Sequence, residues 1–386
     1  MGKGGPYRTL YARHTCEQPE LHGGLNVNPV SVVMLAALLA VVPTVLYATL
    51  IWWLDRYEKE PLPLLMVAFI WGALPAIVLA LILELGAGIP LEWVIVTEQT
   101  RQITEAGLIA PVVEEAVKAV ILVVLFTAYK REFDDVLDGI VYGAMVGLGF
   151  ALVENVLYLS TSALDVPEGA GPDIGGMVGL WLFRSGLFGL NHSMFTAFTG
   201  AALGLARSLR KSWQQGLMPA LGLGTAMVFH AFHNGLVSIV AVSTQGEGDP
   251  GLVVGACLGI LVSDYGGVLL VLVLAIISGA RERHVIQETL WEEVALGRLT
   301  PDEYQTLGSS RLRWNARWTV LFTQGFRRWR QIGKFFDLAT ELAFRKHRMR
   351  DADPVLQSQC ARDIARLRSD IDRLKWFLLW PRQAQT

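Results

Sequence analysis

The sequence is poor in charged residues and in cysteine. Charged residues make up only 18% of the 386 residues, whereas 52% are hydrophobic and the mean hydropathy is +0.40. This balance excludes an ordinary soluble domain and is typical of a polytopic membrane protein. The three cysteines are expected in three different places: Cys16 outside the cell, Cys257 in a membrane helix and Cys360 in the cytoplasm. They are therefore expected to form neither a disulfide framework nor a metal motif.

Two further features are missing from the sequence, a signal-peptide cleavage site and a nucleic-acid recognition motif, and each excludes a class of protein. No cleavage site of small residues follows the polar N-terminal tail, so the first hydrophobic segment is expected to remain as an anchor and not to be removed as a signal peptide. No nucleic-acid recognition motif accompanies the basic residues of the C-terminal part, so no nucleic-acid partner is expected. The lipid bilayer is the partner that the composition predicts.

Seven hydrophobic segments are each long enough to cross a bilayer, which takes roughly 20 residues. They are residues 29–54, 62–86, 107–129, 138–162, 177–206, 216–241 and 251–279. The predicted fold is therefore all-α, a transmembrane bundle of about seven helices. The predicted parts of the chain are a polar N-terminal tail (1–28), a seven-helix core (29–280) and a basic, helical cytoplasmic region (281–386).

The C-terminal region differs from the core in charge and pattern. It contains 20 Lys and Arg against 13 Asp and Glu, a net charge of +7. Thr300 is a predicted N-cap, and Ile364, Leu367, Ile371 and Leu374 recur at helical spacing, so amphipathic helices are expected. Two interpretations stay open: part of the region lies against the anionic inner leaflet, or it forms a small solvated helical bundle.

The charges of the short loops predict the orientation in the cell membrane. The loops after the first, third and fifth predicted helices contain Lys and Arg, whereas those after the fourth and sixth contain acids but no Lys or Arg. By the positive-inside rule, the odd loops and the C-terminus are cytoplasmic and the N-terminus is outside. Lys3, Arg8 and Arg13 in the N-terminal tail argue in the opposite direction.

Several predicted spanning segments contain side chains that lipid disfavours. An ionised group at the bilayer centre costs about 2.5–3.5 kcal/mol on insertion scales, so these groups need partners or a function. Counting along the predicted helices places them at similar depth, in the outer half and near the midplane. We therefore expect one intramembrane polar site, built from Glu114, Glu115 and Lys118, then Glu154, His192, and His230 with His233.

The spacing along each helix suggests how these groups are supported. Lys118 lies three and four residues from the two glutamates, so it is expected to pair with one and leave the other for chemistry. Residues four apart share a helix face. Phe150 and Tyr158 are therefore expected beside Glu154, Thr196 beside His192 and Asn234 beside His230. His233 faces the same cavity or is held by a neighbouring helix.

Other polar and small residues are interpreted as structural. Arg184 and Asp264 are assigned structural roles. The series Gly139, Gly143 and Gly147, with Gly200 and Gly204, predicts close helix contact rather than dimerisation.

These motifs, taken in order, resemble those of the PrsW family of intramembrane proteases. The resemblance rests on Glu114-Glu115-Ala-Val-Lys118, on Phe150-Ala-Leu-Val-Glu154-Asn155 followed by Tyr158, on His192-Ser-Met-Phe-Thr196 and on His230-Ala-Phe-His-Asn234. The loop stretch Asp55-Arg56-Tyr57-Glu58-Lys59-Glu60-Pro61 also resembles that family. The wider clan of CAAX-processing and bacteriocin-processing proteases has histidine where this chain has Glu154, so the narrower family is preferred.

The resemblance implies endoproteolysis of membrane-associated proteins, such as regulators that resemble anti-sigma factors. Glu114 or Glu115 would accept a proton from water, His192 and His230 would position that water or polarise the scissile carbonyl, and Asn234 would help to hold the oxyanion. Glu154 would bind water or carry a proton to the leaving amine. Asn155 and His233 would support the site.

A second form of the hypothesis uses a divalent metal, with zinc suited to the nitrogen and oxygen donors. Its ligands would come from Glu115, Glu154, His192 and His230. The sequence has no His-Glu-x-x-His motif, so metal-assisted and glutamate-type hydrolysis both stay open.

Two other functional classes compete with proteolysis. Acids and histidines in a helix bundle also form the relays of proton- or ion-coupled transporters. Against a transporter, the sequence shows no internal repeat, no discontinuous helix pair is predicted, and the polar groups lie at one depth instead of tracing a path. The third hypothesis is a noncatalytic membrane scaffold that binds partners through its C-terminal region.

Overall fold

A computed structural model describes residues 28–94, 97–130, 132–167, 170–244, 249–350 and 354–383, with the side chains of 88–94 and 376–383 left out. The N-terminal tail, with Cys16, lies outside these residues. In the described part of the chain every regular element is a helix, which confirms the all-α prediction.

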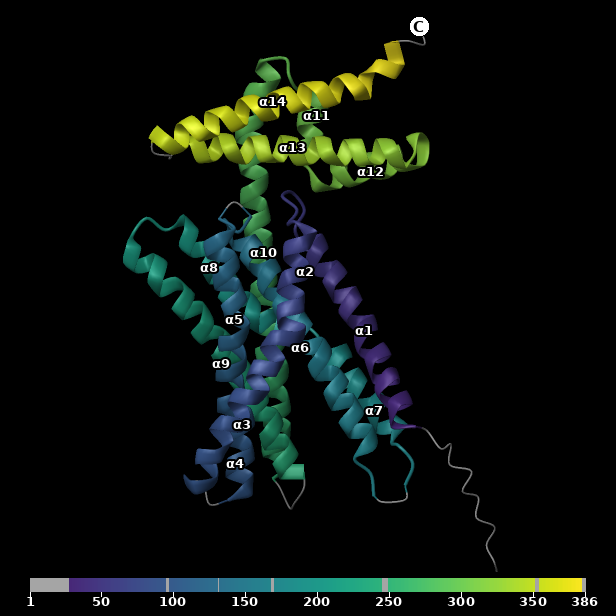
Figure 1. The fold of residues 1–386 in the computed structure, drawn as a ribbon, viewed down its shortest axis with the longest axis vertical. Coiled ribbons are helices and arrows are strands. Elements are labelled where there is room, and N and C mark those ends of the chain that lie inside the picture. Colours follow the sequence, from purple (N-terminus) through teal and green to yellow (C-terminus); the bar gives the residue numbers. More distant parts are fainter. Residues whose placement is uncertain are drawn as a thin grey trace, which may run out of the picture.

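Among the described residues, the bundle consists of ten helices between Pro29 and Ala295 (Figure 1). They are α1 (Pro29–Leu54), α2 (Leu62–Trp71), α3 (Ile77–Val94), α4 (Glu98–Thr104), α5 (Ala110–Ala128), α6 (Val136–Leu164), α7 (Ile174–Trp181), α8 (Asn191–Ser208), α9 (Ser212–Thr244) and α10 (Pro250–Ala295). Three π-helical turns join consecutive helices, at Gly72–Ala76, Glu105–Ile109 and Leu182–Leu187. Such turns are frequent at functional sites.

Five helical segments in the described residues are long and apolar enough to cross a membrane. They are Pro29–Leu54, Leu62–Ala87, Val136–Leu164, Ser212–Thr244 and Pro250–Ala295. The other two predicted spans, 107–129 and 177–206, correspond to the turn Glu105–Ile109 with α5 and to α7 with α8. These segments carry Glu114, Glu115, Lys118 and His192. The chain is therefore a membrane protein, while the number seven stays a prediction.

Helix α6 forms the centre of the bundle and packs closely against α8. A Cβ atom on Gly139 would lie 2.0 Å from the carbonyl oxygen of Gly200, and one on Gly147 would lie 2.0 Å from that of His192. Only glycine permits backbones to approach so closely. The predicted role of the glycine series in helix contact is thus confirmed, and this contact fixes the height of His192 relative to α6.

The segment predicted as one helix over 177–206 is in fact discontinuous. Helix α7 and its π-helical turn end at Leu187, and α8 begins at Asn191. Carbonyl groups released at the break find partners on other helices, because the Tyr47 hydroxyl donates to Ser185 O at 2.8 Å and the Tyr265 hydroxyl donates to Leu187 O at 3.1 Å. Hydrophobicity alone did not reveal these tertiary hydrogen bonds, so the expectation of unbroken helices was wrong here.

The C-terminal region is helical, as predicted, and lies across one end of the bundle (Figure 1). Its helices are α11 (Pro301–Leu307), α12 (Ser310–Gln324), α13 (Phe326–Arg350) and α14 (Pro354–Gln383). Thr300 caps α11 in a capping box, as expected. Helix α10 passes through residue 281 without a break, so the predicted boundary lies inside a helix.

A hydrophobic core joins α10, α13 and α14. Ile364, Leu367 and Ile371 are buried in it together with Ile286 and Leu290 of α10. On α12 a row of aromatic side chains, Trp314, Trp318 and Phe322, stays exposed. The region therefore forms a helical bundle, and its contact with the inner leaflet stays a prediction.

Candidate active site

Four helices bring the predicted polar residues together in one cluster. Helix α5 contributes Glu114, Glu115 and Lys118, α6 contributes Glu154, α8 contributes His192 and α9 contributes His230. Glu114, Glu115, Lys118 and His230 are buried, with at most 6% of their surface exposed. The cluster therefore consists of intramembrane charges that compensate one another, as the cost of burying them requires.

Lys118 lies at the centre of the cluster. Its Nζ atom donates to Glu115 Oε1 at 2.9 Å and to Glu114 Oε2 at 3.1 Å. It also lies 3.1 Å from His192 Nδ1 and 3.8 Å from the centre of the Phe150 ring. The expectation that Lys118 pairs with only one glutamate was wrong, because both carboxylates turn toward the same ammonium group.

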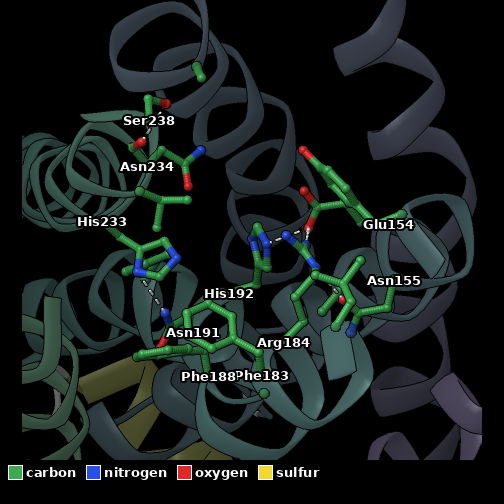
Figure 2. A pocket seen from close by; sticks show the side chains of 17 residues that line it. Glu154, Asn155, Phe183, Arg184, Phe188, Asn191, His192, His233, Asn234 and Ser238 are labelled. Atoms are coloured by element: carbon green, nitrogen blue, oxygen red, sulfur yellow. Dashed lines mark hydrogen bonds and ion pairs between the residues drawn. The ribbon is translucent and has the colours of Figure 1, made fainter. Parts of the chain in front are cut away.

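The contact with Lys118 determines the tautomer of His192. An ammonium group has no lone pair, so Nδ1 of His192 accepts the hydrogen bond and the neutral ring carries its proton on Nε2. Nε2 lies 2.6 Å from Glu154 Oε2, and Arg184 Nη2 lies 2.9 Å from the same oxygen (Figure 2). Glu154 is thus contacted by a ring nitrogen of His192, on α8, and by the guanidinium of Arg184, in the π-helical turn after α7.

His230 is held from both sides. Its Nδ1 lies 3.0 Å from Glu115 Oε1, and a carboxylate only accepts, so Nδ1 carries the proton. Nε2 can then accept from Asn234 Nδ2 at 3.3 Å. Thr196 donates to the other oxygen of Glu115 at 3.0 Å, so this predicted neighbour of His192 supports Glu115 instead.

A cavity of about 260 Å³ opens beside this cluster. His192 and Glu154 lie on its wall, with His233 and Asn234 on the α9 side (Figure 2). Glu114, Glu115, Lys118 and His230 do not line it and lie behind His192. The groups that a molecule in this cavity meets first are therefore the paired His192 and Glu154.

Two other supporting residues, Asn155 and Tyr158, also line this cavity. Asn155 accepts from Arg184 Nε at 2.9 Å and so orients the guanidinium toward Glu154. The same guanidinium stacks 4.0 Å from the Tyr158 ring centre. The ring of Phe150 lies 5.5 Å from that of His192.

Residues assigned structural roles from sequence lie in or directly behind the cavity wall. Arg184 lines the cavity, and Asp264 accepts from His233 Nδ1 at 2.7 Å and from Asn191 Nδ2 at 2.9 Å. Both are ionisable residues inside predicted spanning segments, which is the same sequence signal that identified the other site residues. Glu84 of α3 was missed entirely, although its carboxylate interacts electrostatically with Glu154 and Lys118.

One set of side chains has the geometry of metal ligands. Donor atoms of Glu114, His192 and His230 lie within 4.8 Å of one another. Two imidazoles and one carboxylate match a catalytic zinc site in ligand type. The predicted ligands Glu115 and Glu154 are not in this set, because they orient the histidines through 3.0 Å and 2.6 Å contacts. Lys118 Nζ lies 3.1 Å from Glu114 Oε2 and 3.1 Å from His192 Nδ1, so it neighbours two of these donor groups.

Comparison with known proteins agrees with these motifs. Protease PrsW of Geobacillus kaustophilus (strain HTA426) is 31% identical over 173 residues, covering 43% of this chain and 66% of that relative. Protease PrsW of Clostridioides difficile (strain 630) is 34% identical over 129 residues, covering 33% and 52%. The matched part thus spans slightly less than two thirds of the first relative and about half of the second.

No solved structure matches the chain. The sequence model of the PrsW family of intramembrane metalloproteases matches residues 60–264, which is more than half of the chain and contains every residue of the cluster. The chain belongs to the PrsW family.

Proposed function

We propose that the protein is an intramembrane endopeptidase that hydrolyses peptide bonds of membrane-associated proteins. The observation that carries this proposal is the His192–Glu154 pair on the wall of the cavity, backed by the buried Lys118 cluster. The relatives named Protease PrsW support the same activity.

Glu154 is the group best placed to activate water. As a carboxylate on the cavity wall it accepts a proton from water, and the oxygen of that water forms a bond to the scissile carbonyl carbon. The N–H of His192 and the Arg184 guanidinium hold the carboxylate in position. The protonated Glu154 then returns its proton to the leaving nitrogen as the C–N bond breaks. This assignment gives Glu114 and Glu115 the role of holding Lys118 and His230.

Charge that develops on the carbonyl oxygen requires donors across the cavity. Asn234 lines the cavity and has an amide N–H group. His233 lies next to it, and Asp264 holds its ring through Nδ1, which leaves Nε2 for the cavity side. We assign the oxyanion contact to Asn234. The neutral ring of His233 carries its proton on Nδ1, so its Nε2 supports the site as a hydrogen-bond acceptor.

Zinc-assisted hydrolysis is the second form of this function. The convergence of Glu114, His192 and His230 favours it. When bound, zinc would polarise a carbonyl and acidify water. The residues of this chain would hold it with Glu115 orienting His230 and Glu154 orienting His192. Metal content of the purified protein, compared between wild type and Glu114→Gln, tests this form directly: one zinc per chain, lost in the variant, supports it.

The substrates we propose are single-span or lipid-anchored membrane proteins, including regulators that resemble anti-sigma factors. We also propose that the N-terminus is outside and the C-terminus cytoplasmic. Contacts support one shared side for the odd loops and the C-terminal helices, because Arg313 Nη1 donates to Tyr57 O at 3.2 Å and Arg348 pairs with Asp134.

The test compares membrane proteomes of cells that express wild type, Glu154→Gln, His192→Ala and the control Glu98→Gln, an exposed residue of α4. Fragments that accumulate with wild type and the control, but with neither cavity variant, support the proposal and name a substrate. Identical profiles from all four inserted proteins contradict it. Glu114→Gln separates the roles of the glutamates: if it abolishes cleavage while Glu154→Gln does not, the proton acceptor is Glu114.

A further inference from the structure

A second cavity lies where the bundle meets the C-terminal helices. Its volume is about 380 Å³, within the range of roughly 300–1,000 Å³ that small-molecule sites occupy. Its wall contains Lys130 after α5, Arg207 near the end of α8, Arg281 of α10, and His347 and Arg348 of α13. None of these residues belongs to the candidate active site.

Three of the cations have no carboxylate partner within ion-pair distance in the described part of the chain. Arg207 donates to the main-chain oxygens of Phe126 and Phe133, which are neutral. Lys130 and Arg281 have neither a hydrogen bond nor an ion pair among the described residues, and both are exposed. Lys130 and Arg207 therefore offer positive charge without a carboxylate contact, whereas Arg281 interacts electrostatically with Asp135.

Two of the three acids that line the cavity have partners of their own. Asp134 pairs with Arg348. Asp135 caps α6, accepting from the backbone of Leu137 and Asp138, and it also accepts from Ser278 at 3.2 Å. Glu282 is buried, with one oxygen that has no hydrogen-bond partner in the described residues. The wall therefore holds four Lys and Arg side chains against three Asp and Glu, so positive charge is in excess at the cavity.

An apolar groove of about 420 Å³ adjoins this cavity and shares Val136 and Arg281 with it. The first turns of α9 lean away from α8 (Figure 1), and the groove is lined mainly by α8, α9 and α10. Its side chains include Phe198, Ala202, Leu205, Leu221, Leu274 and Ile277. Leu221 and Ile277 are exposed, so the groove opens sideways, toward the space that lipid occupies around a spanning bundle.

The heights of the two cavities match the layers of a bilayer leaflet. Lys130, Arg207 and Arg281 each follow directly on the end of a hydrophobic segment, at residues 129, 206 and 279. Lipid phosphates lie at this level, and basic pockets between membrane helices bind anionic headgroups. The groove lies on the membrane side of the same residues.

We propose that these two cavities form one binding site for an anionic glycerophospholipid, with its phosphate against Lys130, Arg207 and Arg281 and an acyl chain in the groove between α8 and α9. Arg281, which both cavities share, contacts the lipid at the junction of headgroup and chain. This site is separate from the proposed proteolysis and does not depend on it.

Native mass spectrometry of the full-length protein tests the proposal. The protein is mixed with equal amounts of phosphatidylglycerol and phosphatidylcholine, and the bound lipids are counted. We expect wild type to retain phosphatidylglycerol selectively. The double variant Lys130→Gln/Arg281→Gln should lose this selectivity, by about fivefold in affinity for each charge.

Matched variants separate this site from general surface charge and general hydrophobicity. Arg210→Gln/Lys211→Gln removes two charges from the neighbouring loop, outside the cavity, and should bind as wild type does. Thr225→Phe fills the groove and should weaken phosphatidylglycerol binding several-fold, whereas Val228→Phe, on the same helix but outside the groove, should not.

Three results would overturn the proposal. They are unchanged lipid binding by Lys130→Gln/Arg281→Gln, equal losses in the loop control, and displacement of phosphatidylglycerol from wild type by inorganic phosphate alone. The last result would show a site for soluble anions. Thermal unfolding of each variant in detergent verifies that it is folded, and Thr225→Phe is replaced by Thr225→Leu if it is not.

Discussion

Lys118 Nζ lies 3.1 Å from His192 Nδ1, so a buried cation of α5 directs the proton of a histidine on α8 toward Glu154. The same ammonium pairs with both Glu114 and Glu115. One lysine therefore links two carboxylates that do not line the cavity to the histidine that does. This link explains how so many ionisable groups coexist in an apolar bundle.

The Lys118→Met variant should be destabilised and inactive. Methionine retains much of the side-chain volume but leaves two buried carboxylates without their cation, and breaking a buried ion pair costs about 3–5 kcal/mol. Thermal unfolding in detergent measures the loss. Lys334→Met, at an exposed position of α13, is the control and should unfold as wild type does. Equal stability of the two variants would contradict the central position of Lys118.

The Gly147→Ala variant should lose activity because it separates α6 from α8. The added Cβ would lie 2.0 Å from the carbonyl oxygen of His192, so the helices must move apart and His192 moves relative to Glu154. Gly224→Ala is the control, since a Cβ there meets nothing within 4 Å. Cleavage of a substrate found in the proteome comparison is the measurement. Equal activity of both variants would show that the close contact does not position the histidine.

Stability should decrease as the pH rises from about 4 to about 7. Burial raises the pKa of Asp55, in the loop after α1, to about 7, against the opposing effect of Lys59. An unfolded aspartate ionises near pH 4, so between these values the unfolded chain releases a proton that the folded chain keeps, and rising pH favours unfolding.

The Asp55→Asn variant should lack this contribution. Its amide oxygen can still accept from the Glu60 N–H group, as Asp55 Oδ2 does at 2.8 Å. The unfolding midpoint of the variant should therefore exceed that of wild type by a margin that grows from pH 4 to pH 7. Parallel curves for the two proteins would show that Asp55 ionises normally in the folded state.

The Glu293→Gln variant should loosen the C-terminal bundle. Glu293 is 1% exposed and accepts from Lys346 at 2.8 Å and from Arg368 at 2.6 Å, so it joins α10 to α13 and α14. We expect a loss of about 3–5 kcal/mol, as for other buried pairs.

Glu288→Gln is the matched control, because Glu288 makes a partly exposed pair with Arg350 and surface pairs contribute about 0–1 kcal/mol. Limited proteolysis of α13 and α14 reports the difference. A similar rate of cleavage in both variants would argue against a structural role for Glu293.

Features that follow from spacing and depth along each helix could be predicted from sequence, whereas the specific partners between helices could not. The spacing of Glu114, Glu115 and Lys118 predicts a shared face, and the glycines of α6 predict a close contact. The pairing of Thr196 with Glu115, and of Arg184 with Glu154, depends on how α5, α6 and α8 pack. No spacing within one helix contains that information.

The break before α8 escaped prediction for a related reason. The segment 177–206 is hydrophobic throughout much of its length, and the tyrosine hydroxyls that satisfy its free carbonyl groups come from α1 and α10. Which carboxylate converges with the two histidines depends on the same packing. In the structure it is Glu114, whose oxygen lies within 4.8 Å of a ring nitrogen of each histidine. The assignment of Glu115 and Glu154 as metal ligands stays a prediction.

The origin of the oxygen in the cleavage product tests whether the protein hydrolyses peptide bonds at the His192–Glu154 cavity. The wild-type protein, reconstituted in vesicles with a membrane substrate found in the proteome comparison, is incubated in water enriched in oxygen-18, and the new C-terminus is analysed by mass spectrometry. We predict that one oxygen-18 atom enters the new carboxyl group with wild type and that Glu154→Gln and His192→Ala yield no such product. Labelled product in equal amounts from all three proteins would contradict hydrolysis at the His192–Glu154 cavity.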